Sequence, residues 1–181
     1  MTRPIAFLSE YPAEIPEAQE AAGAGSYEAF ARRHYARLVQ SLTLVVLDPD
    51  LAADAAQEAF LELHLRWREV QQHQNPVGWV HRVGINRCRD HHRYVARTAR
   101  LFKRLADASE PEHDRVEWEG RSDAQAALGC LPRRQRTAAA LFYEADFSVA
   151  EIAAVMNISE GAVKSHLSRA RETLRKVLEA E

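Results

Sequence analysis

Residues 148–157 read Ser-Val-Ala-Glu-Ile-Ala-Ala-Val-Met-Asn, and residues 158–171 read Ile-Ser-Glu-Gly-Ala-Val-Lys-Ser-His-Leu-Ser-Arg-Ala-Arg. Ser148 followed by Glu151 is a capping-box pattern, which predicts the start of a helix. Asn157 predicts its end, because Asn tolerates the left-handed conformation found there. Ser159 predicts the start of a second helix. Two short helices across a tight polar turn indicate a helix-turn-helix, and this motif points to DNA.

The two predicted helices each have one apolar and one polar face. The inward stripe of the first comprises Val149, Ile152, Ala153 and Met156, and that of the second comprises Ala162, Val163, Leu167, Ala170, Leu174 and Leu178. The outward face of the second helix carries Lys164, Ser165, Ser168, Arg169, Arg171 and Arg175. Short polar and cationic side chains suit the major groove, where base edges present acceptors between phosphates. An ordinary amphipathic hairpin with a solvated basic face would have the same pattern.

Composition predicts an all-α chain of two small helical domains joined by a flexible acidic linker. The chain has 181 residues, of which 46% are hydrophobic and 28% charged, and few segments alternate as strands do. We expect a flexible tail over 1–25, a first domain over 26–100, the linker over 101–121 and the helix-turn-helix domain over 122–181. No stretch resembles a signal peptide or a membrane span. Isolated Cys88 and Cys130 fit a reduced, cytoplasmic protein without membrane insertion.

The net charge of −2 conceals a strong asymmetry along the chain. Residues 64–104 hold ten Lys or Arg against two acids, a balance of +8, whereas residues 105–123 hold seven acids against two arginines, a balance of −5. Residues 27–63 have three arginines and six acids, a balance of −3. Charges are screened over about 8–10 Å at physiological salt, so a bound phosphate responds to the local patch.

Four helices are predicted before the helix-turn-helix. The first begins after Ser26 and ends at Asp48-Pro49, the second runs from about Asp50 to Val70, the third opens at Asn75-Pro76 and continues past Tyr94, and the fourth covers 122–131. On the second helix, acids recur every four residues around an apolar centre, which is more than solubility requires. A solvated face is the alternative reading. The members of this acidic stripe are Asp54, Gln57, Glu58, Leu61 and Glu62.

The third predicted helix carries a continuous polar and cationic strip opposite a core face of Val77, Val80, Val83, Gly84 and Cys88. Its members are Arg82, Asn86, Arg89, Arg93, Arg97 and Arg100. Such a strip can follow a phosphate backbone. Trp79 and Tyr94 add aromatic planes on which unpaired bases can stack, although core packing would also explain an aromatic side chain. His81, His91 and His92 do not predict a metal site, because adjacent histidines cannot share one helical face. We expect no metal and no cofactor.

Two DNA-facing modules joined by an acidic linker resemble an extracytoplasmic-function sigma factor of bacterial RNA polymerase. Residues 54–61, Asp-Ala-Ala-Gln-Glu-Ala-Phe-Leu, are similar to the family's second conserved region, and residues 75–90 are similar to its promoter-opening helix. Residues 131–171 are similar to its fourth region. Ala162 stands where that pattern usually has threonine, and His81 where an aromatic is common. The three motifs occur in the family's order and spacing over nearly all of Tyr27 to Val177.

The resemblance implies a function of binding without bond chemistry, so no catalytic residue is expected. The acidic stripe would dock on core RNA polymerase, which members of the family contact through its clamp and flap regions. The minus-ten element would be bound and melted, with a base flipped out near Asn86, by Trp79, Arg82, Asn86, Arg89, Arg93 and Tyr94. The minus-thirty-five duplex would be read by Ser159, Glu160, Lys164, Ser165, Ser168, Arg169 and Arg171, the last on phosphate. Family members are commonly held inactive by an anti-sigma factor, which is the further partner expected.

Three other classes of function stay open at this stage. A response-regulator-type activator has a similar helix-turn-helix and binds duplex DNA without melting it, but it needs a βαβ receiver with a phosphorylatable Asp. A metal-dependent enzyme would use His81, His91 and His92. An interaction module would bind a protein through the acidic stripe and contact DNA only incidentally.

Overall fold

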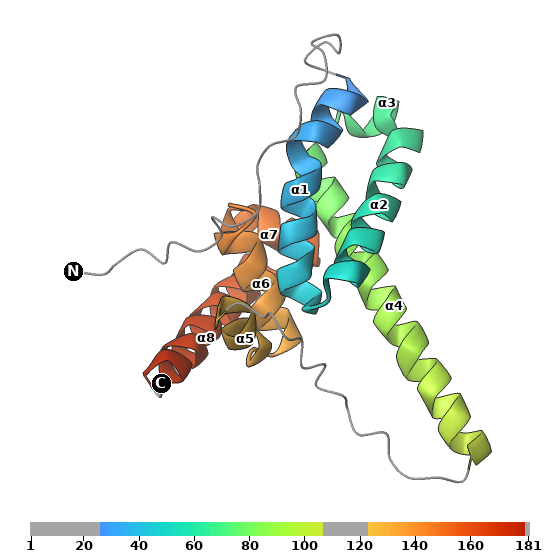
Figure 1. Cartoon of the computed structure of the whole chain (residues 1–181). Helices are drawn as coiled ribbons and strands as arrows, with labels where there is room; N and C mark the ends of the chain where they lie inside the picture. Colours follow the sequence, from blue (N-terminus) through green and yellow to red (C-terminus); the bar gives the residue numbers. More distant parts are fainter. Residues whose placement is uncertain (1–25, 107–122, 180–181) are drawn as a thin grey trace.

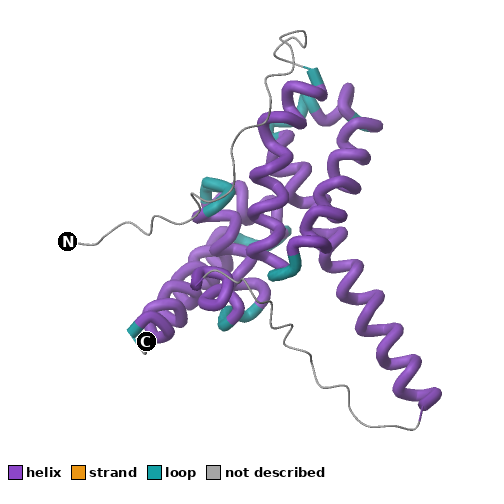
Figure 2. Tube along the Cα trace, in the orientation of Figure 1, coloured by secondary structure: helices purple, strands orange, loops and turns teal. Residues whose placement is uncertain are grey.

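The computed structural model describes residues 26–106 and 123–179, and every regular element in these two ranges is a helix (Figures 1 and 2). This confirms the predicted all-α class. The predicted tail over 1–25 lies outside the described residues, as does most of the predicted linker. The helices are α1 (Tyr27–Val46), α2 (Pro49–Leu65), α3 (Trp67–Val70), α4 (Pro76–Ala106), α5 (Asp123–Gly129), α6 (Arg133–Tyr143), α7 (Val149–Met156) and α8 (Glu160–Leu178).

The first helix begins and ends, and the second helix begins, where local chemistry predicts. The Ser26 side chain accepts a hydrogen bond from the Ala29 amide and caps α1. Leu47 ends α1 in the left-handed conformation, with φ of 60°. Asp48 then caps α2 by accepting from the Leu51 amide, with Pro49 at the first helical position. The Asp48-Pro49 pair therefore ends one helix and starts the next, as expected.

The single helix predicted from about Asp50 to Val70 is wrong in one respect, because it is broken at Arg66. Arg66 leaves helical geometry, with φ of −113° and ψ of 14°, and α3 begins at Trp67. The break places the Trp67 ring 5.2 Å from that of Phe30 and 6.1 Å from that of Tyr27. Packing against α1 thus overrides a helical pattern that the sequence continues without interruption.

The long helix α4 crosses the first group of helices and then extends beyond it. Asn75 caps it, since its Oδ1 accepts from the Gly78 amide at 2.6 Å. Gly84 permits close contact with α1, because a Cβ atom there would lie 2.8 Å from Leu42 Cδ1. Val80, Gly84 and Cys88 are buried, as predicted. The 31 residues give a rod about 46 Å long, and its C-terminal half projects away from the body (Figure 1).

The predicted helix-turn-helix is confirmed. Ser148 and Glu151 form the complete capping box at the start of α7, and Asn157 ends that helix with φ of 54°. Ser159 caps α8 by accepting from the Ala162 amide. The stripes pack inward, with Ile152, Val163 and Leu167 in one buried cluster.

The helix α6 has no counterpart among the predicted elements. Thr137 to Leu141 are all buried, so this segment lacks the alternation of buried and exposed faces from which a surface helix is recognised. The predicted fourth helix over 122–131 corresponds to α5. We expected a linker over 101–121, but its first six residues continue α4.

The N-terminal helices α1–α4 and the C-terminal helices α5–α8 pack against each other. α1 lies along α6, and the start of α4 lies against α7 (Figure 1). Their cores also overlap, because Ala140 of α6 joins the first cluster while Val77 and Ile85 of α4 pack on the second. The division into domains at 26–100 and 122–181 stays a prediction.

Candidate functional site

The acidic stripe of α2 forms an exposed surface with an apolar centre. Asp54, Gln57 and Glu58 are exposed, and Glu62 is partly buried. The Leu61 side chain is 61% exposed, and Leu65, one turn further on, is 77% exposed. Large apolar side chains this exposed mark a surface suited to another protein. Leu65 was not among the predicted residues, although its spacing of four from Leu61 is a signal that could have found it.

Arg87 of α4 pairs with the acidic stripe. Its Nε lies 3.3 Å from Glu58 Oε2, and its Nη2 donates to Glu62 Oε2 at 3.0 Å. Arg66 Nη1 lies 3.7 Å from the other oxygen of Glu62. These pairs are partly exposed, and such pairs contribute only about 0–1 kcal/mol each to stability. Sequence reasoning missed Arg87, because its partners lie on another helix.

The cationic strip of α4 is on the surface, as predicted. Arg82, Arg89 and Arg93 are exposed, Asn86 is partly buried, and the Tyr94 ring is 69% exposed. Arg93 has a weak ion pair with Asp90, with Nη1 and Oδ1 3.6 Å apart. The guanidinium groups and the Tyr94 ring are therefore open to a nucleic acid approaching this side of α4.

Trp79 is placed differently from the rest of the predicted minus-ten set. It is 6% exposed and belongs to the first hydrophobic cluster. The Arg66 guanidinium carbon lies 5.5 Å from its ring centroid, within the range of a cation–π contact. Its contact with DNA stays a prediction, and in this conformation its ring packs in the core.

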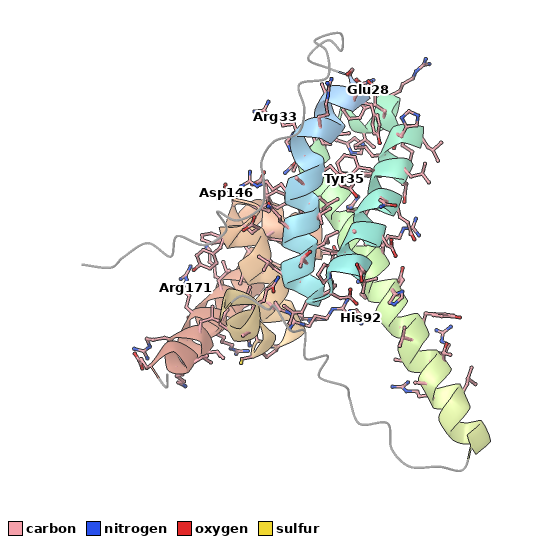
Figure 3. The ribbon with its side chains drawn as sticks, in the orientation of Figure 1. Glu28, Arg33, Tyr35, His92, Asp146 and Arg171 are labelled. Carbon is pink, nitrogen blue, oxygen red and sulfur yellow. The ribbon has the colours of Figure 1, made fainter. Side chains whose placement is uncertain are left out.

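A further cation approaches the strip from α6. Burial lowers the pKa of Arg133, and the charges of Arg89 and Arg93 act in the same direction. Burial also lowers the pKa of His92, helped by the charge of Arg133. Figure 3 shows His92 near the C-terminal end of α1 and the start of α2. Positive charges on α4 and α6 therefore gather here, and an anion such as a phosphate would reduce their repulsion. Arg133 lies more than 40 positions away along the chain, so the sequence did not reveal the cluster.

The polar face of α8 is exposed along its N-terminal half. Lys164, Ser168 and Arg169 are free of contacts that would bury them, and Glu160 is exposed as well. The Ser165 hydroxyl donates to the Gly161 carbonyl at 2.9 Å, while the Ser159 hydroxyl caps the helix. These hydroxyls can still accept hydrogen bonds from a ligand.

Arg171 is held on the surface by α6. Its Nε donates to the Tyr143 hydroxyl at 2.8 Å, and its guanidinium carbon lies 6.0 Å from the centroid of the Phe142 ring. The side chain is exposed, and Figure 3 shows it where α8 passes α6. The guanidinium group therefore keeps its positive charge and further N–H donors at the surface, in keeping with the phosphate contact predicted for Arg171.

The three histidines do not form one site. His81 is 1% exposed, whereas His91 and His92 are exposed further along α4. Within the described ranges, no group of three His, Cys, Asp or Glu is arranged to hold a metal ion. Among these described residues, no helix is long and apolar enough to cross a membrane.

Comparisons with known proteins agree with this arrangement. Residues 30–98 match the family described as Sigma-70 region 2, and residues 121–174 match Sigma-70, region 4. The chain is 29% identical over 166 residues to the ECF RNA polymerase sigma factor SigM of Mycobacterium tuberculosis, covering 92% of this chain and 84% of SigM. It is 31% identical over 140 residues to the ECF RNA polymerase sigma factor SigW of Bacillus subtilis, covering 70% of this chain and 75% of SigW.

The fold is shared with two solved structures. The sigma factor RpoE from Bartonella quintana, solved with the anti-sigma factor NepR, matches with a TM-score of 0.64 and 21% identity over 86% of this chain and 98% of that one. CnrH, solved with the cytosolic domain of CnrY, matches with a TM-score of 0.60 and 25% identity over 86% and 88%.

A helical protein in which a cationic helix is followed along the chain by a helix-turn-helix belongs to the class of DNA-binding transcription regulators. The chain belongs to the extracytoplasmic-function sigma factors. The alternative of a response-regulator-type activator receives no support, because the place of its βαβ receiver is taken by a helical unit that matches sigma region 2.

Proposed function

We propose that this chain binds core RNA polymerase, directs it to a set of promoters and opens the minus-ten region so that transcription starts. The observation that carries the proposal is the arrangement on the N-terminal helices. An acidic helix with exposed leucines, α2, packs beside a cationic helix with exposed aromatic and guanidinium groups, α4. One unit thus offers a surface for a protein and a surface for DNA. Nothing in this function requires a covalent step.

The polymerase-binding surface proposed here is the exposed face of α2. Asp54, Glu58 and Glu62 would meet a basic region of the clamp, and Leu61 would pack in its centre. Leu65 extends the apolar part by one turn. The pairs of Arg87 with Glu58 and Glu62 keep these carboxylates in place before binding. Charge complementarity of this kind steers association, and burial of the leucines supplies affinity.

The minus-ten surface proposed here is the cationic strip of α4. Arg82, Arg89 and Arg93 would neutralise phosphates, while Asn86 would hydrogen-bond an unpaired base. The exposed Tyr94 ring offers a stacking plane, and stacking is worth about 1–3 kcal/mol per base. Flipping a base out of a duplex costs a few kcal/mol, so a pocket and one stacking plane offset much of that cost.

The minus-thirty-five surface proposed here is the N-terminal half of α8. Lys164, Ser165, Ser168 and Arg169 face away from the core and have lengths and donors suited to base edges in the major groove. Arg171 would contact the flanking phosphate while Tyr143 holds its other side. Specific recognition of duplex DNA here would position the strip of α4 over the region to be melted.

A protein inhibitor is proposed as a further partner. Of the two solved structures described above, one holds the sigma factor RpoE with the anti-sigma factor NepR, and the other holds CnrH with the cytosolic domain of CnrY. We propose that an anti-sigma factor binds this chain, as NepR binds RpoE, and that the chain acts in the cytoplasm, where polymerase and promoters are.

Selection of DNA by the complex tests the proposed function. The chain is mixed with core polymerase and fragmented genomic DNA of its host, and the retained DNA is sequenced. We expect two conserved blocks whose centres lie about 25 base pairs apart, and we expect them only when both proteins are present. Retention of one short block by the chain alone, unchanged by polymerase, would instead indicate a simple duplex-binding regulator.

A further inference from the structure

Polar contacts of Arg37, Arg136 and Asn75 join the N-terminal and C-terminal helices, and we call the surface they cross the α1/α4–α6/α7 interface. Arg37 of α1 donates from Nε to the Glu144 carbonyl at 3.1 Å and pairs with the Asp146 carboxylate. Figure 3 shows Asp146 beside α1. Arg136 of α6 donates to the Val45 carbonyl at 3.0 Å. These contacts bind the turn after α6 and the middle of α6 to α1.

The contact of Asn75 lies at the start of α4. Asn75 Nδ2 donates to Glu151 Oε1 of α7 at 2.8 Å. Beside it is a groove of about 370 Å³ between the two helices, lined on the α4 side by Gly78, Trp79 and Arg82 and on the α7 side by Ala154 and other residues. The α7 helix therefore stands over the end of α4 at which the predicted minus-ten residues begin.

A buried histidine lies beneath this interface. His81 of α4 is 1% exposed, and its ring centroid lies 4.8 Å from that of Phe147, which precedes α7. Nδ1 lies 2.9 Å from the Val77 carbonyl, so the Nδ1–H tautomer donates there. Nε2 is buried and has no hydrogen-bond partner among the described residues. Phe147 lies in the turn between α6 and α7. Separation of the C-terminal helices from the N-terminal helices would therefore remove the Phe147 ring from the His81 ring.

The packed arrangement cannot hold both promoter elements at once. The two element centres lie about 25 base pairs apart, or about 85 Å at 3.4 Å per base pair. Asn75 to Asn86 spans about 16 Å of helix, and Glu151 to Ser165 spans at most about 30 Å along two helices and their turn. With Asn75 bonded to Glu151, the two reading surfaces are less than about 60 Å apart. Simultaneous contact requires the interface to open.

We propose that the α1/α4–α6/α7 interface is a latch that holds the free chain closed, and that opening it exposes His81 to water and lets that side chain take up a proton. The need to open for promoter binding rests on the proposed function, whereas the proton coupling rests on the interface alone. A fall in pH would then favour the open chain. Burial of an unpartnered Nε2 disfavours the closed state, which keeps the latch reversible.

The sign and size of the effect follow from the groups around His81. Burial lowers the pKa of His81 from 6.5 to about 4 in the closed chain, and the charges of Arg37 and His34 on α1 act in the same direction. An exposed His81 returns to about 6.5, so the open-to-closed ratio rises about tenfold between pH 7.5 and pH 5.5.

Two neighbouring groups titrate with the interface and have to be separated from His81. Burial lowers the pKa of His34, so its protonation would also favour opening. Burial raises the pKa of Glu144, which faces Arg37, so its protonation favours the closed chain. Asp146 carries the carboxylate paired with Arg37. Variants at His81 and His34 distinguish the two histidines.

Energy transfer within the free, full-length chain tests the proposal without polymerase or DNA. One dye is placed on Leu65→Cys at the far end of α2, and the other on the native, exposed Cys130. Cys88 is buried, and burial raises its pKa to about 12, so it does not label. We expect high transfer at pH 7.5 and an open population about tenfold larger relative to the closed one at pH 5.5. Arg37→Ala should raise the open population at pH 7.5.

His81→Phe keeps a ring against Phe147 but cannot titrate, so we expect it to remove most of the pH response and to leave only the contribution of His34. His34→Gln is the matched control and should retain it. An unchanged response in His81→Phe, loss of the response in His34→Gln, or low transfer at pH 7.5 would each overturn the proposal. Should His81→Phe not fold, NMR titration of the His81 ring decides. Arg37→Ala weakens the interface, so it must raise the midpoint of the His81 titration toward 6.5. An unchanged midpoint would contradict the latch. Failure of the proposed function would appear only in the DNA selection.

Discussion

Truncation of the exposed leucine at the centre of the acidic stripe, Leu61→Ala, should weaken binding to core RNA polymerase. The side chain is 61% exposed in the free chain, so about that share of it is available for burial against a partner. Full burial of a leucine is worth about 1.5–3 kcal/mol, which gives about 1–2 kcal/mol here. The dissociation constant should therefore rise about 5- to 30-fold. Leu65→Ala, with 77% exposure, should have an effect of similar size.

The assay is a titration of labelled chain with core polymerase, followed by fluorescence anisotropy. Folding should be unaffected, because both leucines are exposed and alanine has high helix propensity. Leu101→Ala is the matched control, since this leucine is 54% exposed on the projecting part of α4. Binding of Leu61→Ala within twofold of the unsubstituted chain, or an equal loss in Leu101→Ala, would refute the assignment of α2 as the docking surface.

The double variant Asn86→Ala, Arg93→Ala should abolish promoter opening while polymerase binding stays intact, because it removes the base-binding amide and a phosphate contact from the strip; permanganate footprinting of the complex measures this. Lys164→Ala should weaken binding to the selected duplex by about 1–3 kcal/mol and relax the sequence preference at one position, since a base contact is lost; titration of the selected duplex and of its single-base variants measures it. Gly84→Val should lower the free energy of unfolding by about 1–3 kcal/mol, because its Cβ would lie 2.8 Å from Leu42 Cδ1 and α1 would have to move; thermal unfolding followed by circular dichroism measures it.

The Lys164 and Gly84 predictions each have a control on the same element or of the same residue type, and the double variant has a clear contradicting outcome. An unchanged bubble in the Asn86 and Arg93 double variant would show that this helix is misassigned. Lys176→Ala should leave duplex binding unchanged, because Lys176 pairs with Glu172 near the far end of α8; an equal loss would mean that any charge on α8 matters equally. Gly161→Ala should be tolerated, since its Cβ would have only Ser159 Oγ nearby, at 3.9 Å. A stable Gly84→Val would contradict the close α1–α4 contact.

Local signals were enough to predict several of the helix boundaries. The caps at Ser26, Asp48, Ser148 and Ser159, and the left-handed end at Asn157, depend on residues within four positions of each other, so the sequence shows them directly. The exposed faces of α2, α4 and α8 followed from helical periodicity in the same way. Most predicted site residues are accordingly exposed.

Features that depend on distant packing were not predictable in this way. The helix break at Arg66 depends on the packing of Trp67 against aromatic rings of α1, and the burial of Trp79 depends on the hydrophobic core of the N-terminal helices. Arg37 meets its partners 107 and 109 positions away, and Asn75 meets Glu151 after 76 positions. Such contacts leave no periodic trace. The polar latch, and the burial of His81 beneath it, therefore became apparent only from the folded chain.

Run-off transcription tests the central claim most directly. Purified chain, free of any inhibitor, is added to core polymerase of its host with a template carrying the two selected blocks. We predict discrete transcripts that start downstream of the minus-ten block, require the chain and disappear in the Asn86→Ala, Arg93→Ala variant. Absence of RNA from every such template, although the chain is folded and bound to polymerase, would contradict the account.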